Sequence, residues 1–155
     1  MTRTTHWLAG TLLASASHLV CAAPDPSGTF VLEEATIAGI HAALRADRIN
    51  CHELVARYLD RIAAYDKAGP AINALVVVNE AALARADELD RARQGGGPTG
   101  PLHCIPVIVK DNFDTIDLPT TAGSLSLEGF VPNRDAFQVR RIREAGGIVM
   151  AKSNM

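Results

Sequence analysis

Apolar residues recur at helical spacing along the first half of the chain. Three stretches, over residues 37–44, 50–62 and 80–93, repeat their apolar positions with the period of a helix that buries one face. Asn50, with a glutamate three residues later, forms a start that resembles a capping box, and Asn79 can cap the third stretch. The side chains expected to face inward are Ile37, Ile40, Leu44, Leu54, Val55, Tyr58, Leu59, Ile62, Leu83, Ala86 and Leu89.

Three other segments have the pattern of strands. Residues 72–78 are apolar and rich in β-branched side chains. Residues 105–109 and 148–151 are short, continuously apolar runs, which are typical of strands buried on both faces. Pro106 fits best near the start of its strand, because proline cannot donate a hydrogen bond to a ladder.

The second half of the chain therefore has the order strand, loop, helix, strand. The loop covers residues 111–128, and the helix is expected to open at Asp135 and to end at a Gly-Gly pair. This order predicts a parallel βαβ unit and an α/β fold class. Because a parallel sheet needs cover on both faces, and little follows the strand over 148–151, we expect the polypeptide to be the truncated first part of a longer domain.

The N-terminus has the pattern of a cleaved export signal. An arginine supplies positive charge, residues 7–20 are mostly apolar, and small residues precede Ala23. We therefore expect a signal peptide over residues 1–22, a domain over 23–155, and a periplasmic or secreted location. A lipid anchor on Cys21, an uncleaved anchor and a plain extension are the alternatives. The apolar stretch is too short and too polar for stable membrane insertion.

Composition narrows the expected partners and ligands. A net charge of −2 with 21% charged residues gives no electrostatic reason to expect nucleic acid as a partner. Two separate thiols are the favoured interpretation of Cys51 and Cys104, although an oxidising compartment would allow them to pair. The histidines show no metal-ligand spacing, so no metal is expected.

Lys110 is the residue of most chemical interest. It directly follows a predicted strand, and ligand sites in parallel sheets lie beyond the carboxyl ends of strands. A lysine that loses its proton at neutral pH can accept one from a serine hydroxyl. Position alone, however, favours a surface charge for both Lys110 and Lys152. For Asp111 and Asp114 it favours solvated loop carboxylates, and not a carboxylate pair. For residues 120–124 it favours a turn, and not a pocket.

The motif around Lys110 changes that interpretation. Residues 100–112, Gly-Pro-Leu-His-Cys-Ile-Pro-Val-Ile-Val-Lys-Asp-Asn, closely resemble the opening motif of the amidase signature family, and residues 120–124 and 145–155 resemble two further stretches of it. The resemblance implies the N-terminal part of an α/β/α domain with a mixed, largely parallel sheet covered by helices. It also implies a Ser–cis-Ser–Lys triad in which Lys110 is the base, and it implies no cofactor.

The resemblance also shows what this sequence lacks and where it departs from the family. Both serines of the triad belong to a Gly/Ser-rich motif that the sequence does not contain, and Ser124, Ser126 and Ser153 lie in other motifs. Cys104 stands where the family usually has glycine. If that glycine needs a positive φ, Cys104 would strain the turn before the strand.

The combination of motif and export signal predicts an exported amidase. Its substrate would be a small-molecule or peptide amide, because peptide-amide hydrolases are the most similar branch of the family. An amidotransferase subunit that acts on glutamyl-tRNA shares these motifs and is one alternative. A non-catalytic truncated product is the other, since a base without a nucleophile cannot form an acyl-enzyme.

Overall fold

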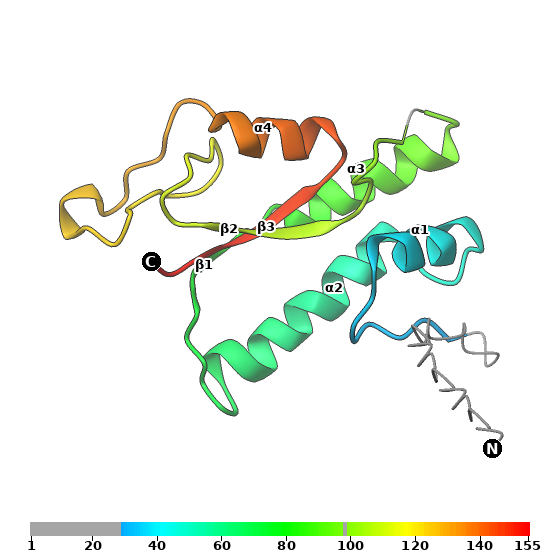
Figure 1. The fold of residues 1–155 in the computed structure, drawn as a ribbon, viewed down its shortest axis with the longest axis horizontal. Helices are drawn as coiled ribbons and strands as arrows, with labels where there is room; N and C mark the ends of the chain where they lie inside the picture. The colour runs from blue at the N-terminus through cyan, green and yellow to red at the C-terminus, as the bar shows by residue number, and fades with distance from the viewer. Residues whose placement is uncertain (1–28, 98) are drawn as a thin grey trace, which may run out of the picture.

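The computed structural model describes residues 29–97 and 99–155 (Figure 1), so the predicted signal peptide lies outside the described residues. The described part forms a three-stranded sheet of β1 (Leu75–Val78), β2 (Pro106–Lys110) and β3 (Ile148–Ser153), in the order β1-β3-β2. β2 runs parallel to β3 and β1 runs antiparallel to it, so the predicted mixed sheet is confirmed. The helices are α1 (Ile37–Arg45), α2 (Cys51–Ile62), α3 (Ala82–Gln94) and α4 (Phe137–Glu144).

Helices cover both faces of this sheet, with α4 on one side and α2 on the other (Figure 1). The alternation of side chains over the first three residues of β3 explains the two layers. Ile148 and Met150 are buried in a core shared with α1, α2 and α3. Val149, between them, packs with Val109 of β2 and Val139 of α4. Among the described helices, none combines the length and apolarity needed to cross a membrane.

The predicted helix starts are confirmed where a side chain caps the backbone. The Thr36 hydroxyl accepts the Gly39 N–H at 3.0 Å, and the Asn50 side chain accepts the Glu53 N–H at 2.7 Å. The prediction that Asn79 caps the third helix was wrong: α3 begins at Ala82, and Asn79 accepts the Ala81 N–H at 3.0 Å in the turn before it.

Three other predictions about local structure were wrong. Asp135 does not cap α4; its carboxylate accepts the Ile116 N–H at 2.9 Å and lies 3.1 Å from Arg143 Nε, which ties the preceding loop to the helix. Ile37 is 46% exposed instead of inward. The first strand begins only at Leu75, because Asn73 has a φ of +53° and the chain turns there.

The turns before β2 and β3 pack directly against each other. The Leu102 N–H donates to the Ala145 carbonyl at 2.9 Å, and the Cys104 N–H donates to the Gly146 carbonyl at 3.1 Å. A Cβ on Gly100 would overlap the Ala145 carbonyl oxygen. Gly146 has a φ of +91°, and a Cβ there would lie 2.9 Å from His103 Cα. Two glycines of the family motifs are therefore explained by close backbone contact.

Cys104 joins Cys51 in a disulfide, so the favoured interpretation of two separate thiols was wrong. The bond links the first residue of α2 to the residue two before β2, with a sequence separation of 53. In the chain-entropy model, closing a loop of this length stabilises the fold by roughly 4 kcal/mol. Cys104 has a φ of +62°, so the expected strain at this position is present.

We predict that glycine is more stabilising than alanine at position 104. Both Cys104→Gly and Cys104→Ala remove the disulfide and the thiol, but only glycine accepts the positive φ without a steric penalty. The free energy of unfolding, measured by urea titration, should be about 1 kcal/mol higher for Cys104→Gly than for Cys104→Ala. An alanine variant as stable as the glycine variant would contradict the strain at this residue.

Candidate functional site

Lys110 is the last residue of β2, at the carboxyl end of the strand, as predicted. Its backbone pairs with Ser153 of β3, and its side chain is exposed. Pro106 and Ile108 of the same strand line a groove, and the two-residue period of a strand places Lys110 on that face. The strand therefore presents Lys110 at the end of the groove.

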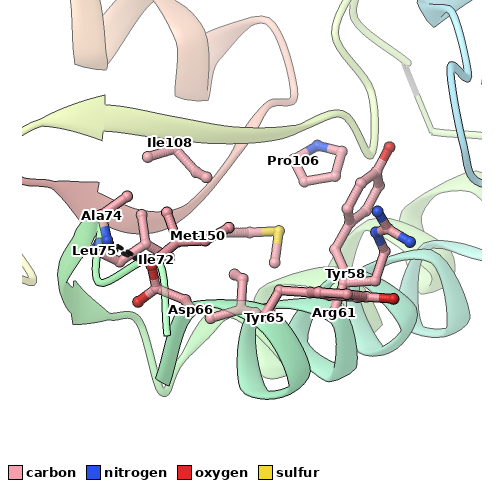
Figure 2. Close-up of a pocket in the computed structure, with 11 residues that line it drawn as sticks. Tyr58, Arg61, Tyr65, Asp66, Ile72, Ala74, Leu75, Pro106, Ile108 and Met150 are labelled. Atoms are coloured by element: carbon pink, nitrogen blue, oxygen red, sulfur yellow. Dashed lines mark hydrogen bonds between the residues drawn. The ribbon is translucent and has the colours of Figure 1, made fainter. Parts of the chain in front are cut away.

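The groove lies between the sheet and the end of α2, and its volume is about 580 Å³. Figure 2 shows Tyr58, Arg61 and Tyr65 on the helical side of this groove, with Pro106 and Ile108 on the strand side. The Arg61 guanidinium lies 5.3 Å from the centre of the Tyr65 ring. The walls are mostly apolar, with charged groups at the helical edge.

Hydrogen bonds fix the backbone immediately after Lys110. The Lys110 carbonyl accepts the Phe113 N–H at 3.0 Å, which closes a turn. The Asp111 N–H donates to the Ser153 carbonyl at 3.0 Å, and the Asp111 carbonyl accepts the Ala122 N–H at 3.1 Å. These hydrogen bonds, on the C-terminal side of Lys110, therefore fix the direction of the backbone as it leaves the sheet.

Asp111 is buried, so its interpretation as a solvated loop carboxylate was wrong. It is 1% exposed, and its carboxylate accepts hydrogen bonds from the backbone N–H and the hydroxyl of Thr121. Asp114 is exposed, as expected. The segment over residues 120–124 folds as a turn in which the Gly123 N–H donates to the Thr121 hydroxyl at 3.2 Å.

Lys152 is fully buried, so its interpretation as a surface charge was also wrong. Its ammonium donates to the Phe113 carbonyl and the Thr120 hydroxyl, each at 2.8 Å. Longer bonds reach the Pro119 carbonyl at 3.2 Å and the Thr115 hydroxyl at 3.3 Å, and one Asp111 carboxylate oxygen lies 3.5 Å away. Burial lowers the pKa of Lys152, and the charge of Asp111 acts in the opposite direction.

Among the described residues, Cys51, His103 and Cys104 form a buried group whose possible metal-ligand atoms lie within 4.8 Å of one another. The spacing of residues in the sequence does not predict this group, because Cys51 and His103 are 52 positions apart. The disulfide joins the two sulfurs, whereas a metal ion would need them as thiolates. With the disulfide formed, the two cysteines are therefore a covalent cross-link next to His103.

The comparisons with known proteins place this site in a family. The family model described as Amidase matches residues 53–155. A probable amidase of Arabidopsis thaliana is 39% identical over 132 residues, which cover 83% of this chain and 25% of that protein. One glutamyl-tRNA(Gln) amidotransferase subunit, from Maridesulfovibrio salexigens, is 40% identical over 125 residues, which cover 80% of this chain and 25% of that protein.

Solved structures agree with the sequence relatives. Native peptide amidase from Stenotrophomonas maltophilia matches with a TM-score of 0.77 and 43% identity, over 79% of this chain and 25% of that one. Peptide amidase PAM in complex with the competitive inhibitor chymostatin matches with a TM-score of 0.78 and 43% identity, over 81% of this chain and 26% of that one. The chain therefore belongs to the amidase signature family. It spans about a quarter of the length of the curated relatives it matches.

We predict that His103 makes the fold less stable in mild acid. Burial and the nearby His41 lower the pKa of His103 below its usual 6.5, while Asp90 opposes them and Arg93 and Arg85 of α3 add to them. Below pH 6.5 the His103 side chain binds a proton in the unfolded chain, whereas in the folded chain it binds one only at a lower pH. The free energy of unfolding should therefore fall from pH 7 to pH 5, by at most about 1.4 kcal/mol per unit.

The matched variant is His103→Gln, which does not titrate in this range. Urea titrations at several pH values should show that the stability advantage of the wild type over this variant shrinks as the pH falls. Parallel stability curves for the two proteins would contradict the lowered pKa of His103.

Proposed function

We propose that this chain is the lysine-bearing first part of an amidase, in which Lys110 is the base of a Ser–cis-Ser–Lys triad. The observation that carries the proposal is the position of Lys110: an exposed lysine at the carboxyl end of a parallel strand, within the family motif. Membership of the family supports the same role. The nucleophilic serine and the bridging serine would lie in a Gly/Ser-rich motif of a longer polypeptide.

The chemistry follows from these roles. Lys110, acting through the bridging serine, accepts the proton of the nucleophilic serine, whose oxygen attacks the amide carbon. The amine or ammonia leaves with a proton as the acyl-enzyme forms. Water then attacks the ester, and the carboxylic acid and the free serine are released. The reaction hydrolyses a carboxamide, and each step needs only a base, a nucleophile and water.

The substrate class we propose is a linear carboxamide, including the C-terminal amide of a peptide. Its support is the likeness to peptide amidases, at 43% identity and TM-scores of 0.77 and 0.78. The amidotransferase subunit remains a second candidate, because several such subunits are 37–42% identical to this chain. Export would separate the protein from tRNA, so the location of the protein distinguishes the two.

We also propose that the protein is exported to the periplasm or the medium, with residues 1–22 as the cleaved signal. The pattern of the N-terminus supports this proposal, as does the Cys51–Cys104 disulfide, because disulfides persist in oxidising compartments.

Removing the base should abolish amide hydrolysis. In the full-length protein, Lys110→Ala should lower kcat for a peptide amide by about 10³-fold. Lys110→Arg should be equally impaired, because arginine keeps the charge but cannot give up its proton. The release of ammonia measures both rates, and Lys67→Arg, at a lysine that is 51% exposed, is the control. Near-normal hydrolysis by Lys110→Ala would rule out the proposed role of Lys110.

Export should leave two chemical marks on the protein. Mass spectrometry of the protein from the native host should find a mature chain that begins at Ala23. Alkylation under denaturing conditions should modify Cys51 and Cys104 only after reduction. A cytosolic protein with an intact N-terminus and free thiols would contradict export and favour the amidotransferase subunit.

A further inference from the structure

The loop after β2 folds around the ammonium of Lys152. Among the described residues, every hydrogen-bond partner of this ammonium, and the carboxylate nearest to it, belongs to one continuous stretch of chain, from Asp111 to Thr120. The shortest bonds reach the Phe113 carbonyl and the Thr120 hydroxyl, near the two ends of this stretch. The ammonium therefore holds both ends of the loop to β3.

The strand pairing also connects Lys152 to the backbone that carries Lys110. Val109 pairs with Lys152 across the parallel strands, and Lys110 pairs with Ser153. The pairing shifts between Val107–Val149 and Ile108–Ala151, which reverses the alternation of β3 after Met150 and puts Lys152 on the same face as its partner Val109. Lys110 follows Val109 directly, so its side chain is presented on the other face. The residue that links the two is Asp111, which follows Lys110 directly.

Asp111 is bound through both its backbone and its side chain. Its N–H extends the ladder to Ser153, its carbonyl accepts the Ala122 N–H, and its carboxylate holds Thr121. One carboxylate oxygen, Oδ1, is buried and has no hydrogen-bond partner among the described residues, and the Lys152 ammonium lies 3.5 Å from it. Removing Lys152 would leave a buried carboxylate without a compensating charge.

We propose that Lys152 and Asp111 are positioning residues that hold the Lys110 backbone in the orientation needed for proton transfer. This inference rests on the proposed function, because it assumes that Lys110 is the base. A base must meet its proton donor at hydrogen-bond distance, and a displacement of about 1 Å can cost about 10²-fold in rate. The pair acts through the turn over residues 110–113 and has no direct contact with a substrate.

The test compares variants of the full-length enzyme. Lys152→Met keeps the volume of the side chain but removes its charge, and should lower kcat for a peptide amide by about 10²-fold with KM changed less than about threefold. Val139→Ala, which removes buried volume on the same face of the sheet, is the control for lost stability. It should lower the melting temperature and leave kcat within about threefold of the wild type.

A second pair of variants, at Thr120, keeps the test decisive if Lys152→Met fails to fold. Thr120→Val removes the hydroxyl that accepts from Lys152, whereas Thr120→Ser retains it. The valine variant should lose about tenfold in kcat, and the serine variant should stay within about threefold of the wild type. Amide hydrogen exchange over residues 110–122 should increase in Thr120→Val and stay unchanged in Val139→Ala.

The outcomes separate the two proposals. If Lys110→Ala is inactive while Lys152→Met and Thr120→Val keep the wild-type kcat, the positioning role is wrong and the proposed function stands. If KM rises and kcat does not change, the positioning role is also wrong. If Lys110→Ala keeps its activity, or the wild type has none, the proposed function fails and the positioning role fails with it.

Discussion

The contact between the turn before β2 and the turn before β3 determines where every other part of this site lies. Gly100 lies against the Ala145 carbonyl, and Gly146 lies against His103, at distances that leave no room for a Cβ. Backbone hydrogen bonds between the two turns then lead directly into the parallel pairing of β2 with β3. A different register of these strands would move Lys110 and Lys152 away from their partners.

The sequence was sufficient for features that depend on near neighbours. Helix periodicity, the Asn50 cap and the positions of β2 and β3 follow from residues a few positions apart, and the structure confirms them. The predicted burial on both faces is confirmed for β3 but wrong for β2, in which Ile108 is 49% exposed. The place of Lys110 at a strand end could be predicted for the same reason. The motif resemblance then gave the family and the mixed sheet, which the comparisons and the structure confirm.

Predictions failed where the outcome depends on residues far apart in the chain. Lys152 is bonded to residues 32 to 39 positions earlier, and Cys51 meets Cys104 at a separation of 53. No periodic pattern encodes such distances, so exposure was the reasonable prediction for a lysine. Asp111 was misjudged for the same reason, because its burial follows from the loop that closes over Lys152.

The two lysines near this sheet edge have opposite environments, and that difference is the reason we propose Lys110, and not Lys152, as the base. In the described part of the chain Lys152 is enclosed, and carbonyl and hydroxyl oxygens surround its ammonium. Lys110 is one step further along the strand pair, on the opposite face, and its side chain is open. Because Val109 and Lys110 face opposite sides of β2, and Lys152 pairs with Val109, the strand pairing places a buried charge next to an exposed lysine. In the proposed mechanism, the buried Lys152 holds the backbone that positions the exposed Lys110.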